Sequence, residues 1–164
     1  MTIEDPIQKK QQILLHELRM CDKQAKRLVY SLKHVKKIAP FTRENIVDAT
    51  EQEIETIDAF ILRFSRLQDI LGKKIFRFLL EISGEELVIM IDVLNKMEKI
   101  NIINDANEWM NIREIRNFAI HEYAEDDAQH VVDSLNKIIN FSEELLVILN
   151  KVKQYITKEL GLKY

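Results

Sequence analysis

The chain has 164 residues, of which 46% are hydrophobic and 31% charged, with only three Gly and two Pro. This balance excludes an intrinsically disordered chain, and so few Gly and Pro residues leave little material for the turns of a β-sheet protein. We expect one all-α domain over residues 1–164, folded as an antiparallel bundle of about five helices.

The first predicted helix covers residues 6–38. Asp5 before Pro6 is an N-cap followed by proline at the first helical position, and Pro40 follows the expected end. Apolar side chains recur along it at alternating spacings of four and three, which predicts a long, narrow packing seam. These positions are Leu14, Leu18, Cys21, Ala25, Leu28, Leu32 and Val35.

Residues 39–49 are predicted to be a connector, and the second helix covers residues 51–82. Thr50 with Glu53 forms a capping box at its start. Its basic residues are either a solubilising face or a wall that attracts phosphate, and the first reading is the commoner one. They are Arg63, Arg66, Lys73, Lys74 and Arg77. Asp69 and Lys73 are expected to pair at i,i+4.

Three further helices follow, each with an expected cap. Ser83 with Glu86 predicts a third helix up to about residue 100, in which Leu87, Met90, Ile91, Leu94 and Met97 face inward. Asp105 with Glu108 predicts the start of a fourth helix. Asp126 or Asp127 begins the fifth, and Gly161 suits its C-terminal cap.

Charge and cysteine content limit the surroundings and partners. No apolar run reaches the roughly 18 to 20 residues of a membrane span, and residues 1–10 lack the apolar core of a signal peptide, so we expect a cytoplasmic protein without membrane contact. Cys21 has no partner cysteine and is expected to be a buried apolar side chain. Residues 1–40 hold nine Lys or Arg against four acids, a solvated face or, alternatively, a nucleic-acid contact.

The fourth helix contains an unusual polar stretch, REIRNFAIHEY, at residues 113–123. On a helical wheel Ile112, Ile115, Phe118 and Ala119 share one arc, which predicts that they face the core. The polar side chains are predicted to lie on the opposite, outward side: Arg113, Arg116, Asn117 and His121.

Such a polar face suits metal-free cleavage of RNA, in which a ribose 2′-hydroxyl attacks the adjacent phosphorus. His121 can take or give a proton near neutral pH, Arg116 can form a bidentate contact with phosphate, and Asn117 can orient the imidazole. Arg116 and His121 lie about 140° apart on one helix, so two copies related by a two-fold axis would bring them together better than one.

Arg116, His121 and Tyr123 together resemble the R-x4-H-x-Y motif of HEPN-domain proteins, in particular the HepT toxins that pair with minimal nucleotidyltransferase antitoxins. Residues 57–74 also look like the long second helix of these proteins. The resemblance implies a bundle with a four-helix core and a dimeric, metal-independent endoribonuclease without a cofactor. It also implies that the partner antitoxin silences the toxin by placing AMP on Tyr123. Candidate RNA contacts are Arg113, Arg63, Arg66, Lys73 and Arg77.

Two alternatives remain beside this reading. Other HEPN proteins are noncatalytic modules that act with a nucleotidyltransferase, and nothing in the motif excludes that role. The polar residues of the fourth helix can also be plain surface groups, with Tyr123 anchoring the helix end. No metal site is expected, because Glu125 stands where a zinc-binding HExxH sequence would need its second histidine.

Overall fold

A computed structural model describes residues 5–86, 88–121 and 127–164, with the side chains of residues 120 and 121 outside that description. The described chain is all-α and contains no strand, which confirms the predicted fold class. The predicted connector holds a helix that we did not expect. The helical elements are α1 (Pro6–Val35), α2 (Arg43–Val47), α3 (Glu51–Ile70), the π-turn η1 (Leu71–Ile75), α4 (Phe76–Ile82), α5 (Met90–Lys99), α6 (Ala106–His121) and α7 (Ala128–Glu159).

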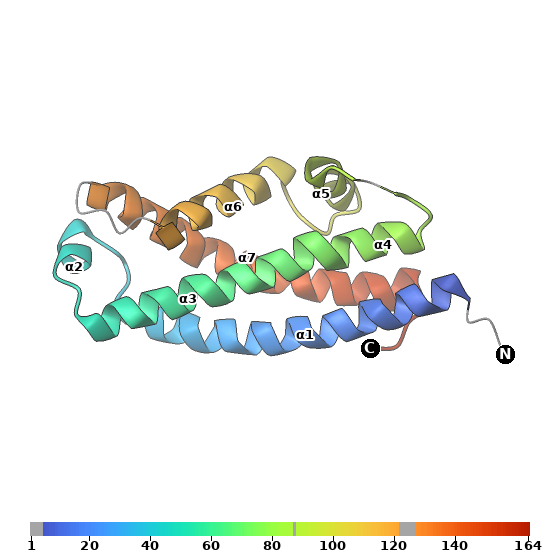
Figure 1. Cartoon of the computed structure of the whole chain (residues 1–164), viewed down its shortest axis with the longest axis horizontal. Helices are drawn as coiled ribbons and strands as arrows, with labels where there is room; N and C mark the ends of the chain where they lie inside the picture. The colour runs from blue at the N-terminus through green and yellow to red at the C-terminus, as the bar shows by residue number, and fades with distance from the viewer. Residues whose placement is uncertain (1–4, 87, 122–126) are drawn as a thin grey trace.

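The long helices form an elongated bundle in which neighbours alternate in direction (Figure 1). α1 lies along α3, and α6 packs on α7, while α3, η1 and α4 follow one another without a break. α5 covers one end of the bundle beside α6, and α2 covers the other end against α7. Within the described residues, none of the helices combines the length and apolarity that crossing a bilayer requires.

The helix ends largely follow their predicted caps. The Asp5 carboxylate accepts a hydrogen bond from the Ile7 amide at 3.1 Å, so α1 begins at Pro6 as expected. Thr50 and Glu53 close their capping box at the start of α3. Asp105 accepts from the amides of residues 107 and 108 at 2.7 and 3.1 Å, and Asp127 caps α7.

The predicted start of the third helix is wrong. Ser83 does not cap a following helix, because its hydroxyl donates back to the Leu79 carbonyl at 2.9 Å. Gly84 then takes φ +82°, and the Glu85 amide donates to the Leu80 carbonyl at 2.8 Å. This is the glycine-based end of the preceding helix, so α5 begins only at Met90. The expected inward position of residue 87 lies outside the described residues.

The core seam of α1 is confirmed. Six of its seven predicted positions are buried, and Ala25 is half-buried against the core. Cys21 is fully buried, and burial in this apolar setting raises the pKa of its thiol to about 12. A thiol that stays protonated is a poor nucleophile, which fits the expected structural role of this residue.

The π-turn η1 lies where the bundle packs most closely around a tryptophan of α6. A Cβ placed on Gly72 would be 3.4 Å from the indole of Trp109, which is itself 1% exposed. Phe76 lies on the same indole, with the ring centroids 5.1 Å apart. An alanine at position 72 would just touch the indole, and a longer side chain would have to displace it, so α6 packs closely on η1 at this point.

Candidate functional site

The arginine of the motif points into the bundle. Arg116 is 4% exposed and lies on the buried stripe of α6 together with Trp109, Ile112 and Ala119. Our assignment of Arg116 to the outward face is therefore wrong. The reason is geometric: at about 100° per residue, Arg116 lies only about 40° from Ile112, closer than Ile115 does.

The other predicted faces of α6 are only partly as expected. Ile112 and Ala119 are buried, whereas Ile115 and Phe118 are half-buried at the edge of the core. Arg113 is half-buried and Asn117 is exposed. Residue 121 is the last residue of α6, but its side chain lies outside the described residues, as does the whole of Tyr123.

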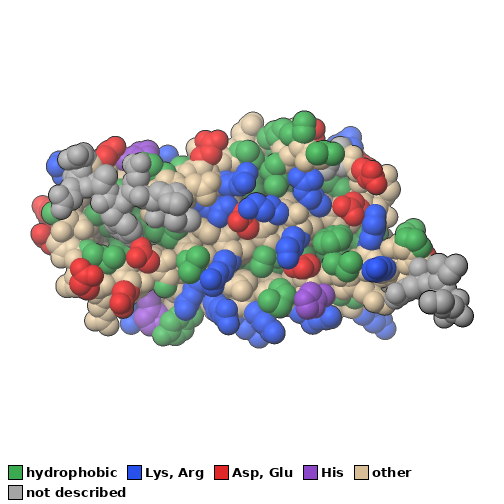
Figure 2. Space-filling model, viewed as in Figure 1, with side chains coloured by type: hydrophobic (Ala, Val, Ile, Leu, Met, Phe, Trp, Pro, Cys, Tyr) green, Lys and Arg blue, Asp and Glu red, His purple; other side chains and the backbone are tan. Residues whose placement is uncertain are grey.

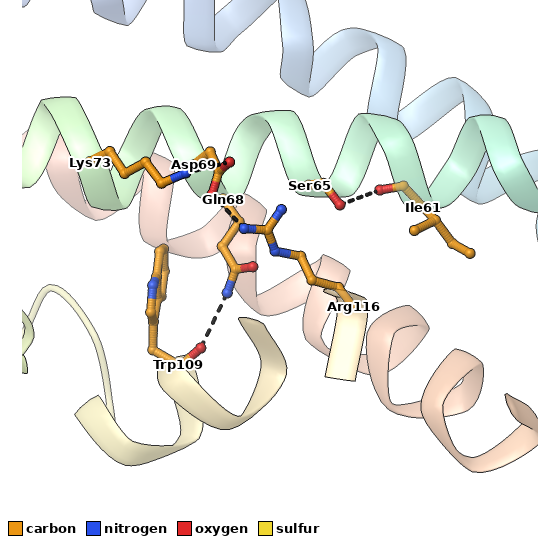
Figure 3. Close-up of polar contacts among 7 residues, drawn as sticks. All are labelled: Ile61, Ser65, Gln68, Asp69, Lys73, Trp109 and Arg116. Carbon is orange, nitrogen blue, oxygen red and sulfur yellow. Dashed lines mark hydrogen bonds and ion pairs between the residues drawn. The ribbon is translucent and has the colours of Figure 1, made fainter. Parts of the chain in front are cut away.

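Arg116 is held by a carboxylate of α3 (Figure 3). Its Nη2 donates to Asp69 Oδ1 at 2.5 Å, and the second oxygen of Asp69 accepts from Lys73 Nζ at 2.9 Å. The expected pair of Asp69 and Lys73 is thus present, but Asp69 also reaches across to α6. One carboxylate between two cations leaves a net positive charge at the junction of α3 and α6.

The neighbouring glutamine fixes the backbone of α6 to the same helix. Gln68 is 1% exposed, and its side-chain amide donates to the Trp109 carbonyl at 3.3 Å. Figure 3 shows Gln68 and Asp69 extending from α3 toward α6, with Trp109 and Arg116 on either side. Two adjacent residues of α3 therefore set the position of the helix that carries the motif.

One nitrogen atom of each of two arginines of α6, Arg113 and Arg116, lacks a hydrogen-bond partner among the described residues. The Nε groups of Arg113 and Arg116 are both buried, and neither has a hydrogen-bond partner among the described residues. Burial lowers the pKa of the Arg116 guanidinium, Asp69 opposes this effect, and the charge of Arg113 adds to it. Unpaired buried donors are costly, and the excess positive charge around them favours an anion close to this junction.

The predicted RNA contacts of the second helix fall into separate places. Arg63 turns toward α1, where its Nη1 donates to Ser31 Oγ at 2.6 Å. Arg77 donates to the Val88 carbonyl at 2.9 Å. Arg66 is exposed, and Lys73 joins the Arg116 junction. Lys73 and Arg77 line a common hollow, whereas Arg63 and Arg66 do not belong to it. Figure 2 shows Lys and Arg side chains spread across the middle of this face.

Two hollows flank this region. One of about 210 Å³ between α1 and the η1–α4 segment is lined by Glu17, Lys73, Lys74, Arg77, Phe78 and Glu81, and Lys74 is paired there with Glu17 at 3.1 Å. The other lies between α6 and α7 and contains Glu108 and Glu144. Burial, and then the charge of Glu108, raises the pKa of Glu144. Two carboxylates against the single cation of Lys137 make the lining of the second hollow unfavourable for phosphate.

Sequence reasoning did not identify Asp69 as the partner of Arg116. The available signal was indirect: an arginine within 40° of a core position on the helical wheel requires a buried counter-charge, and α3 has few acids in its second half. Among the described residues, no group of three or more His, Cys, Asp or Glu side chains is arranged to hold a metal. No family model, curated protein or solved structure matches the chain.

Proposed function

We propose that this protein is a metal-independent endoribonuclease that acts as a homodimer, the toxin of a toxin–antitoxin pair of the HepT type. The observation that carries the proposal is the buried Arg116, which has an unpaired Nε beside the unpaired Nε of Arg113 and excess positive charge. A phosphodiester beside this junction would be attracted by its positive charge, and the side chains that bury the two Nε groups would have to move before it could accept from either of them. The motif that Arg116 begins supplies a histidine at position 121 for proton transfer.

The reaction needs nothing beyond RNA and these side chains. The ribose 2′-oxygen forms a bond to phosphorus while the bond from phosphorus to the 5′-oxygen breaks. The proton of the 2′-hydroxyl is taken up by a base, and the departing oxygen receives a proton from an acid. A neutral imidazole can act as the base and a protonated one as the acid, so the His121 residues of two subunits provide both. The products are a 2′,3′-cyclic phosphate and a 5′-hydroxyl.

The arginines provide electrostatic stabilisation in this proposal. Charge grows on the phosphate oxygens as the pentavalent transition state forms, and a guanidinium held in a region of low water content interacts with that charge strongly. Arg116 is fixed by Asp69, so little reorganisation accompanies the reaction. Asn117, exposed one turn before His121, would orient the imidazole.

The test is cleavage of RNA by the purified protein in the presence of a chelator. We expect a labelled single-stranded RNA to be cut to fragments that end in a cyclic phosphate, and an all-DNA strand of the same sequence to remain intact because it lacks the attacking hydroxyl. Cleavage of both strands, or activity that requires added magnesium, would contradict the mechanism.

Control of the toxin is proposed to act through Tyr123. A partner nucleotidyltransferase would transfer AMP from ATP to the phenol oxygen, releasing pyrophosphate, and the bulky adenylyl group would block the cleft. Incubation with ATP and a minimal nucleotidyltransferase, if one is encoded beside this protein, should add one AMP mass to the peptide that contains Tyr123. Tyr123→Phe should gain none. A gain on another peptide would remove this assignment and leave the cleavage chemistry in place.

One observation favours a second candidate, a noncatalytic helical module that assembles with a nucleotidyltransferase. The guanidinium of Arg116 already has a carboxylate partner, and the side chain is only 4% exposed, as in a purely structural ion pair. Expression in a bacterial host discriminates the two. The enzyme should arrest growth and its His121→Ala variant should not, whereas the noncatalytic module should be harmless in both forms.

A further inference from the structure

A tyrosine on α1 is unusually exposed for an aromatic side chain in this bundle. Tyr30 is 60% exposed, although aromatic rings in helical bundles mostly serve the core. Its ring lies 4.3 Å from the ring of His34, at an interplanar angle of 33°. The guanidinium of Arg63, from α3, lies over the same ring at 5.7 Å from its centroid. A second ring and a cation are therefore gathered around one exposed ring.

The members of this cluster are held in place by other contacts. Arg63 Nη1 donates to the hydroxyl of Ser31, which is 3% exposed, and to the Arg27 carbonyl at 3.3 Å. The Nδ1 atom of His34 lies 2.8 Å from the Tyr30 carbonyl oxygen, within hydrogen-bonding distance. Both neighbours of the ring are thus anchored to backbone or buried groups. The cluster is formed before any ligand arrives, which limits the entropy lost on binding.

We propose that Tyr30, His34 and Arg63 form a stacking platform for the bases of single-stranded RNA. The inference rests on the proposed function only in taking RNA as the ligand. Bases of every sequence stack on aromatic rings and on arginine planes, and proteins that bind single strands combine such rings with positive charge. α1 provides that charge, since residues 1–40 hold nine Lys or Arg against four acids. The platform therefore suits an RNA strand better than an apolar protein partner.

One exposed cation of α3, Arg66, lies between the platform and the Arg116 junction. Arg63 and Asp69 are six residues apart, about 9 Å along the helix axis, and Arg66 lies midway in both height and angle. Arg66 is exposed. Figure 2 shows Lys and Arg side chains over α1 and α3, with hydrophobic and histidine side chains among them. A strand stacked on Tyr30 would thus have its backbone led toward the arginines of α6.

The test measures binding of the full chain to a fluorescent 12-nucleotide 2′-O-methyl oligouridylate by anisotropy. This probe has no free 2′-hydroxyl and cannot be cleaved by the proposed reaction, so binding is measured apart from catalysis. We expect Tyr30→Ala to weaken binding about tenfold, because base stacking on one aromatic ring is lost. Tyr30→Phe keeps the ring and should bind as the wild type does.

Tyr164 offers a matched control. It is 46% exposed and has Lys153 over its ring at 4.9 Å, so it is a second surface tyrosine with a cation. Its hydroxyl donates to the Leu18 carbonyl at 3.3 Å, in the middle of α1 and about three turns before Tyr30. Tyr164→Ala should leave the affinity unchanged. Equal affinities of the two alanine variants, or no binding by the wild type, would overturn the inference. A loss of self-association in Tyr30→Ala with unchanged affinity would instead make the patch an interface between copies.

The failure of this inference can be separated from the failure of the proposed function. A protein that binds the probe through Tyr30 but cuts no RNA would keep the platform and lose the ribonuclease. A protein that cuts RNA while Tyr30→Ala binds the probe normally would keep the ribonuclease and lose the platform.

Discussion

Replacing His121 with alanine is expected to slow RNA cleavage about 100- to 10,000-fold, the usual contribution of an acid–base side chain. The expectation follows from the chemistry, since the attacking hydroxyl must lose a proton and the departing oxygen must gain one. Initial rates on a labelled single-stranded RNA in a chelator measure the loss. Arg116→Lys, which keeps the charge but loses the bidentate fork, should slow the reaction about 100-fold.

Controls for these variants come from the same chain. His16 is an exposed histidine on α1, remote from α6 in the sequence, and His16→Ala should leave the rate unchanged. Thermal unfolding followed by circular dichroism shows whether each variant keeps the helical fold. A folded His121→Ala protein with the rate of the wild type would contradict the proposed reaction, and equal losses in His121→Ala and His16→Ala would point to a general surface effect.

The helices that begin at strong caps could be predicted well from the sequence. Asp5 with Pro6, Thr50 with Glu53, and Asp105 each place an acceptor next to unpaired amides at the start of a helix, and this local chemistry does not depend on the rest of the fold. The buried positions of α1 were predicted equally well. Apolar residues that repeat every seven positions over a 30-residue helix all lie on one side, and only that side can face the core.

Two local predictions, the start of the third helix and the connector after the first, are wrong. Short polar motifs with the spacing of a capping box do not by themselves show where a helix starts. Ser83 and Glu86 have the spacing of a capping box, yet Gly84 makes this segment the end of α4. Conversely, Thr42 and Asn45 form a capping box for α2, within the segment predicted to be a connector. The side chain of Asn136 then holds the Phe41 backbone in both directions, at 3.1 Å each. Such a long-range contact has no signature in the sequence.

The sequence indicated which residue types belong to the candidate site, but it did not indicate whether the Arg116 side chain faces the core or the solvent. The motif identified Arg116 from the sequence, whereas its inward orientation depended on which apolar residues of α6 form the core. Trp109 is the largest buried side chain of α6 and is absent from the predicted core. Once Trp109 is counted as a core residue, the centre of the buried stripe lies close to Arg116 on the helical wheel. Asp69 was known only as a partner for Lys73, since pairing between helices cannot be derived from spacing within one helix.

Asp69 is the residue whose loss should most affect the stability of the fold around Arg116. Replacing it with alanine leaves a buried guanidinium without its counter-charge, and removing one partner of a buried pair is strongly destabilising. The side chain of Asp69 is 35% exposed, so water can partly replace it. We expect the free energy of unfolding in urea to fall by about 2 kcal/mol, below the range for fully buried pairs.

Two further variants isolate the contribution of the inter-helix pair. Lys73→Ala removes only the exposed i,i+4 pair and should cost about 0.5 kcal/mol or less. Asp69→Leu combined with Arg116→Met removes both charges, fills the space with apolar atoms, and should recover most of the stability lost in Asp69→Ala. That double variant should be folded and unable to cleave RNA, because it lacks the group that we propose contacts phosphate. If Lys73→Ala and Asp69→Ala cost the same, the pair with Arg116 does not hold α6 on α3; if the folded double variant still cleaves RNA, Arg116 is a structural residue and the catalytic role assigned to it is wrong.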